Sequence, residues 1–91
     1  MYAMAKEQPR EHLLTPREIG RLLGFYSATR VNHVLRKLGY QWRDENGDWR
    51  LADKGIPYGR EFVGYTTRRT AYVRWRPAVI EEVRRVIQDG A

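Results

Sequence analysis

The apolar residues between positions 15 and 39 recur at steps of three and four residues, which predicts two short amphipathic helices. The stripe of the first helix consists of Ile19, Leu22 and Leu23. The stripe of the second consists of Ala28, Val31, Val34, Leu35 and Leu38. We expect these stripes to be buried against each other, so that residues 15–39 form a helix, a tight turn and a second helix.

Both predicted helices carry residues that start and stop a helix. Thr15 fits the N-cap of the first helix, and Glu18 completes a capping box with it. Ser27 fits the N-cap of the second helix. Gly24 and Gly39 fit the two ends, because glycine adopts a positive φ without strain.

After residue 39 the pattern changes to the alternation of β-strands. Residues 40–43 and 49–51 predict a β-hairpin around an Asn-Gly turn. Residues 60–66 and 70–76 predict a second hairpin with residues 67–69 at its tip. A helix-turn-helix that is followed at once by a hairpin has the element order of a winged helix.

Residues 77–88 predict a closing helix that opens with a proline. The sequence therefore predicts an α+β fold: a small winged-helix-like domain over residues 13–91, with a helix-turn-helix, two β-hairpins and a C-terminal helix. Residues 1–12 are polar and aperiodic, and we expect them to form a flexible N-terminal arm.

The second helix leaves a polar face with no acidic residue between positions 27 and 39. Its members are Ser27, Thr29, Arg30, Asn32, His33, Arg36 and Lys37. Asn32 and His33 can hydrogen-bond to base edges, Asn to adenine in particular, and the basic residues suit phosphates. The helix also occupies the recognition position of a helix-turn-helix. We therefore predict contact with double-stranded DNA, with a merely solvated helix face as the alternative.

The charge balance supports a polyanionic partner. Seventeen Lys and Arg against eleven Asp and Glu give a net charge of +6. Arg68 and Arg69 at the second hairpin tip are candidates for phosphate contacts, and a solvated turn is the alternative. The first hairpin tip, residues 44–48, is acidic and should repel phosphate, although Arg43 and Arg50 at its base could still reach one.

The residue types argue against other classes of function. The chain has no Cys, and its only histidines, His12 and His33, lie in different segments, so we expect no metal site and no cofactor. Ser27 is six residues from His33, which is the wrong spacing for one helix face, so we do not expect an enzyme. No apolar run approaches the roughly 20 residues of a membrane span, and we expect a cytoplasmic protein.

Several motifs occur together in an order that resembles the C-terminal domain of phage antirepressors of the KilA type. They are "LTPREIGRLLG" at 14–24, "VNHVLRKLGYQ" at 31–41, "KGIPYG" at 54–59 and "WRPAVI" at 75–80. The resemblance implies a winged-helix DNA-binding protein of a phage or prophage, with a role in transcription regulation. A homodimer that spans two half-sites is one expected form. The alternative is a small phage-encoded inhibitor of a host protein, such as a polymerase or nuclease.

Overall fold

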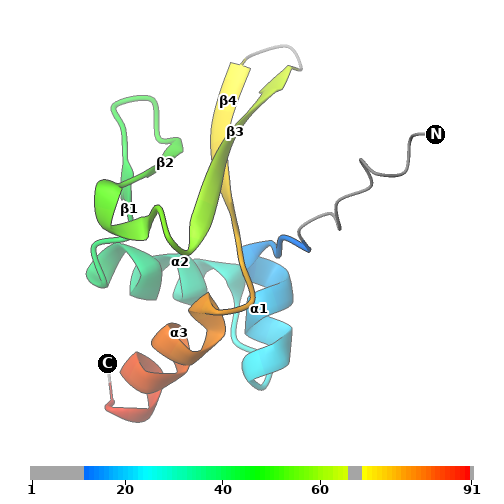
Figure 1. Cartoon of the computed structure of the whole chain (residues 1–91), viewed down its shortest axis with the longest axis vertical. Coiled ribbons are helices and arrows are strands. Elements are labelled where there is room, and N and C mark those ends of the chain that lie inside the picture. Colours follow the sequence, from blue (N-terminus) through cyan, green and yellow to red (C-terminus); the bar gives the residue numbers. More distant parts are fainter. Residues whose placement is uncertain (1–11, 66–68, 91) are drawn as a thin grey trace, which may run out of the picture.

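Three helices and two β-hairpins make up the described part of the chain, which comprises residues 12–65 and 69–90 of a computed structural model. The elements are α1 (Pro16–Leu23), α2 (Ala28–Lys37), β1 (Gln41–Arg43), β2 (Trp49–Leu51), the 3₁₀ turn η2 (Asp53–Gly55), β3 (Gly59–Tyr65), β4 (Arg69–Trp75) and α3 (Val79–Gln88). The helices lie together at one end, and the β3–β4 hairpin projects away from them with the β1–β2 hairpin beside it (Figure 1). Residues 1–11 of the predicted arm, and Arg68, lie outside the described residues.

The predicted caps of α1 are confirmed. The Thr15 hydroxyl accepts a hydrogen bond from the N–H of Glu18 at 3.2 Å, and the Glu18 carboxylate accepts one from the N–H of Thr15 at 2.8 Å. Gly24 follows the helix in the left-handed region, with φ 114°. The local sequence therefore fixes both ends of α1.

The ends of α2 also agree with the sequence, whereas α3 begins later than predicted. The Ser27 hydroxyl accepts a hydrogen bond from the N–H of Arg30 at 3.1 Å, and Gly39 lies just past the helix with φ 82°. The closing helix was expected to open at Pro77, but α3 begins at Val79, after a turn.

A close approach of two backbone segments sets the turn between α1 and α2. The N–H of Tyr26 donates to the carbonyl of Gly20 at 3.0 Å, and a Cβ at Gly20 would lie 1.9 Å from the carbonyl oxygen of Tyr26. Only glycine fits there. Phe25, in the same turn, has φ 68°, a left-handed conformation that costs an L-residue roughly 1–2 kcal/mol.

Both hairpins are antiparallel, and they form two separate two-stranded sheets. In the longer one Phe62 lies opposite Tyr72, and their rings stack with centroids 5.6 Å apart. Leu14, just before α1, bridges Trp75 at the end of β4 through backbone hydrogen bonds of 2.7 and 2.9 Å. The base of the β3–β4 hairpin is therefore tied to the start of the helical part.

The core combines residues from the helices and from β4. The buried hydrophobic residues are Leu14, Ile19, Val31, Val34, Leu35, Tyr40, Val73, Trp75, Val79 and Val83. Trp75 is fully buried, and Gly59 leaves room for its ring, because a Cβ there would lie 2.8 Å from a ring carbon. Burial, followed by the negative charge of Glu82, raises the pKa of the Tyr40 hydroxyl to about 12.

One predicted core residue is not in the core. Leu22 was expected to pack in the stripe of α1, but 59% of its surface is exposed. The packed side of α1 includes Ile19 and Gly20, where the turn comes closest to the helix. At 3.6 residues per turn, the midpoint of these two lies roughly 110° from Leu22, so the packed side turns away from it.

The coarse fold prediction is confirmed: a small α+β unit with three helices and two antiparallel hairpins in the expected order. Within the described residues, no helix combines the length and the apolar character that crossing a membrane requires.

Candidate nucleic-acid interface

The outer face of α2 carries the polar residues predicted to contact DNA. Val31, Val34 and Leu35 are fully buried on the opposite side, which fixes the orientation of the helix. The exposed residues of the outer face are Thr29, Arg30, His33, Arg36 and Lys37. Ser27 is exposed at the cap, and Asn32 is half-buried at the edge of the face.

Asn32 is held in position by Gln41 of β1. Gln41 is buried, and its Nε2 donates to the backbone oxygen of Asn32 at 3.2 Å and to Oδ1 of Asn32 at 3.0 Å. This hydrogen bond uses one of the two lone pairs of Oδ1 and none of the amide N–H groups of Asn32. It therefore fixes the orientation of the amide, and the predicted pairing with adenine, which uses the oxygen and the nitrogen together, stays a prediction.

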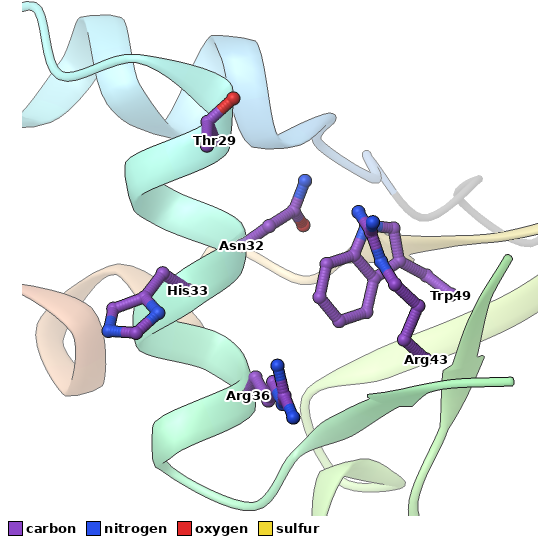
Figure 2. A pocket seen from close by; sticks show the side chains of 6 residues that line it. All are labelled: Thr29, Asn32, His33, Arg36, Arg43 and Trp49. Carbon is purple, nitrogen blue, oxygen red and sulfur yellow. The ribbon is translucent and has the colours of Figure 1, made fainter. Parts of the chain in front are cut away.

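Arg43 and Trp49 face α2 from the first hairpin. They lie opposite each other across β1 and β2, and the Arg43 guanidinium lies over the Trp49 ring, 4.4 Å from a ring centroid. Figure 2 shows this pair facing Asn32, with Arg36 further along the helix and His33 pointing away from Trp49. Helix and hairpin together line a hollow of about 220 Å³.

Two more hollows adjoin the first one. The second, of about 290 Å³, shares Asn32 and Trp49 with the first and extends to Tyr72 and Arg74 of β4. The third, of about 600 Å³, shares Arg17 with the second and lies at the turn between α1 and α2. We call the residues that line these three hollows the basic surface.

The basic surface has an excess of positive charge. Its arginines are Arg17, Arg21, Arg36, Arg43 and Arg74, and none of the described residues that line it is acidic. Within the described residues, none of these arginines forms a salt bridge. Glu18 interacts electrostatically with Arg74, and its pKa is lowered. The main cause is the hydrogen bond that the backbone N–H of Thr15 donates to the Glu18 carboxylate. Glu18 is thus engaged in the cap of α1.

A fourth hollow, of about 250 Å³, lies between the two hairpins and mixes charges of both signs. Arg50 and Arg69 line it together with Asp44 and Asp48. Arg50 forms salt bridges with Asp44 at 3.5 Å and with Glu61 at 3.1 Å. We call these five residues the hairpin junction. Arg50 was expected to be able to reach a phosphate, but its guanidinium is bound within the fold.

The acidic residues of the hairpin junction also bind backbone groups. Oδ1 of Asp44 accepts a hydrogen bond from the N–H of Asp48 at 3.0 Å, and Oδ2 of Asp48 accepts one from the N–H of Ala71 at 3.2 Å. Oε1 of Glu61 accepts one from the N–H of Leu51 at 2.8 Å. Asp44 and Asp48 therefore shape the turn and join the hairpins, and the repulsion of phosphate by this acidic tip stays a prediction.

These contacts shift the pKa values of the charged groups that form them. The backbone hydrogen bond from Asp48, which outweighs the desolvation of the carboxylate, lowers the pKa of Asp44. Burial acts to raise the pKa of Glu61, but the hydrogen bonds from Arg50 and from the Leu51 N–H outweigh it and lower that pKa. The hydrogen bond to Glu61 raises the pKa of Arg50.

The predicted DNA-binding residues divide into three groups. Ser27, Thr29, Asn32, His33 and Arg36 line the basic surface. Arg30 and Lys37 are exposed on α2 but do not line it, and the guanidinium of Arg30 lies 5.5 Å from the Tyr26 ring centroid. Arg69 belongs to the hairpin junction, far along the sequence from α2, and Arg68 lies outside the described residues.

The predicted site omitted several residues that line the basic surface. Arg17 and Arg21 are four residues apart and both exposed, so their spacing in α1 was a signal that they share a helix face. Arg74 is exposed beside the buried Trp75, as strand alternation requires. The position of Trp49 beside α2 had no local signal, because it depends on how the hairpin packs.

The chain matches no protein-family model, and neither the curated proteins nor the solved structures contain a significant match to it. In the part of the chain that the structure describes, no group of three or more His, Cys, Asp or Glu is placed to hold a metal ion.

Proposed function

We propose that this protein binds double-stranded DNA through the basic surface, with α2 as the helix that reads base edges. The observation that supports this most is that the lining of three adjoining hollows contains five arginines and no acidic residue among the described ones. A phosphate backbone is the polyanion that such a surface suits, because each neutralised phosphate releases counterions and adds affinity.

In this proposal the residues of α2 have different tasks. Thr29, Asn32 and His33 line the first hollow together with Arg36 and Arg43, and they meet base edges in the major groove, where Asn32 donates its N–H₂ to an acceptor such as a purine N7. Arg36 and Arg43 meet phosphates on the hairpin side of the helix. Lys37, at the exposed end of α2, adds a phosphate contact outside the hollows.

At the other end of the basic surface, beside the α1–α2 turn, Arg17 and Arg21 of α1 suit the next phosphates along the DNA backbone. A first helix that crosses the backbone while the second enters the groove is the docking mode of a helix-turn-helix. Arg30 at the start of α2 is a further candidate for a base contact. Arg68, which the sequence predicts at the second hairpin tip, remains a proposed phosphate contact. Arg69 lines the hairpin junction with Asp44 and Asp48 and is not assigned one.

The biological role that we propose is regulatory. The motif order that resembles the KilA-type antirepressor domain supports a winged-helix regulator of a phage or prophage, acting in the cytoplasm of the host cell. A homodimer would place two α2 helices on two half-sites about one helical turn apart. Mobility-shift experiments with the regulatory region next to its own gene, with measurement of the size of the complex, test both points.

The main test compares two variants with the same loss of charge. Arg36→Ala/Arg43→Ala removes two arginines from the basic surface, and Arg84→Ala/Arg85→Ala removes two from α3, where they pair with Glu81 and Glu82. For the wild type, log K should fall with log salt by about 0.9 per phosphate neutralised. The first variant should flatten that slope by roughly 1.8, and the second should leave it nearly unchanged.

Two results would contradict this proposal. Equal effects of the two variants would mean that net charge, not the basic surface, carries the binding. No DNA binding by the wild type at low salt would favour the alternative partner, a host protein.

A further inference from the structure

Phe25 occupies a position that folding alone does not explain. Its side chain is 87% exposed, and its backbone has φ 68°, the region that suits glycine. A glycine here would remove both the exposed aromatic surface and the strain. Strained backbone at an exposed site is a reason to look for a binding role.

The surroundings of Phe25 indicate what kind of partner it meets. Phe25 lines the third hollow together with Arg17, Arg21 and Ser27, so it belongs to the basic surface. It comes two residues before the cap of α2, the helix assigned to the major groove. An apolar ring in the same hollow as two arginines suits a partner that presents an apolar group close to negative charges.

DNA presents one such group in the major groove, the 5-methyl group of thymine, and aromatic side chains are among those that contact it. We propose that Phe25 contacts a thymine methyl group while Arg17 and Arg21 hold the flanking phosphates. This inference rests on the proposed DNA binding and adds a preference for thymine at the position that faces the α1–α2 turn.

Two duplex polymers test the inference directly. Alternating poly(dA-dT) and poly(dA-dU) have the same phosphates and the same hydrogen-bonding groups, and they differ only in the methyl group. The wild type should bind the thymine polymer about fourfold more tightly for each methyl group contacted. Phe25→Gly should bind the two polymers equally, because the ring that distinguishes them is gone.

A control and a stability measurement accompany this test. Ile56→Ala removes another exposed apolar side chain, 56% exposed on the loop after η2, and should keep the preference for thymine. Phe25→Gly should have a Tm equal to or above that of the wild type, because the left-handed position favours glycine. Loss of preference therefore cannot be attributed to unfolding.

The outcomes separate this inference from the proposal beneath it. If the wild type binds both polymers equally, with a steep salt dependence, DNA binding stands and the role of Phe25 is overturned. If Phe25→Gly keeps the full preference, the methyl group is read elsewhere and the inference is again overturned. If neither polymer binds at low salt, the proposed function itself has failed. A change of oligomeric state in Phe25→Gly, with the preference kept, would assign the ring to a second copy of the chain.

Discussion

The basic surface and the hairpin junction both contain arginines, yet only one of them suits an external anion. On the basic surface, Arg36 and Arg43 line a hollow without acidic residues and form no salt bridge within the described residues. At the hairpin junction, Arg50 lies between Asp44 and Glu61. Whether a cation serves binding or folding is therefore decided by the acids that the fold places next to it.

This difference changes how the charge of the sequence is interpreted. Residues 40–54 have a formal excess of acid, yet they supply Arg43 to the basic surface. Residues 60–76 are strongly basic, yet Glu61 from that block binds Arg50. The net charge of a segment thus does not locate a binding surface, because pairing occurs between segments.

The largest expected effect tests the buried side of α2, which keeps its outer face in place. Leu35→Ala should lower the free energy of unfolding by about 2–5 kcal/mol, because Leu35 is fully buried. Leu22→Ala is the control: Leu22 is 59% exposed, and its change should stay within about 0.5 kcal/mol. Urea denaturation measures both. A similar loss in both variants would mean that Leu22 is packed, contrary to the structure.

A smaller effect is expected from changing one group of the basic surface, the side-chain amide of Asn32. Asn32→Asp keeps an oxygen for the hydrogen bond from Gln41 but replaces the N–H₂ donor by a negatively charged oxygen. Affinity for the preferred DNA site should fall by about 1–3 kcal/mol, with little change in Tm.

Asn46→Asp is the matched control for that change, since it adds the same charge at the exposed hairpin turn. It should reduce DNA affinity far less than Asn32→Asp. Equal reductions, measured by titration at constant salt, would show that Asn32 acts only through the overall charge of the protein.

How much of this the sequence alone could predict depends on whether a feature is local. The capping box at Thr15, the Ser27 cap and the hairpin alternation are local, and each is confirmed. The exposure of Leu22 was missed because the close approach at Gly20 rotates the packed side of α1, which apolar spacing does not reveal. The contact of Gln41 with Asn32 joins a strand to a helix and had no sequence signal.

The hairpin junction should contribute to stability without contributing to DNA binding. Glu61→Gln weakens the hydrogen bonds to Arg50 and to the Leu51 N–H and should lower the free energy of unfolding by about 1–2 kcal/mol. DNA affinity should stay unchanged. Glu45→Gln, an exposed acid of the same hairpin, should leave stability nearly unchanged. If Glu61→Gln lost DNA affinity and Glu45→Gln did not, the hairpin junction would contribute to DNA binding together with the basic surface.

The smallest expected effect is the pH dependence of stability that the same carboxylates cause. The pKa values of Glu61 and Asp44 lie below their ordinary values of 4.5 and 3.8, so the folded state binds fewer protons than the unfolded state in acid. Their contribution is fully present above about pH 5 and is lost as the pH falls through the folded-state values. Between pH 5 and 8 these two groups should leave the free energy of unfolding constant.

Glu61→Gln tests this pH dependence. Between pH 6 and 3 its free energy of unfolding should fall less steeply than that of the wild type, as measured by denaturation. A loss of equal steepness would mean that Arg50 does not hold Glu61 in the charged form. Arg50 would then be as available to a phosphate as the arginines of the basic surface are.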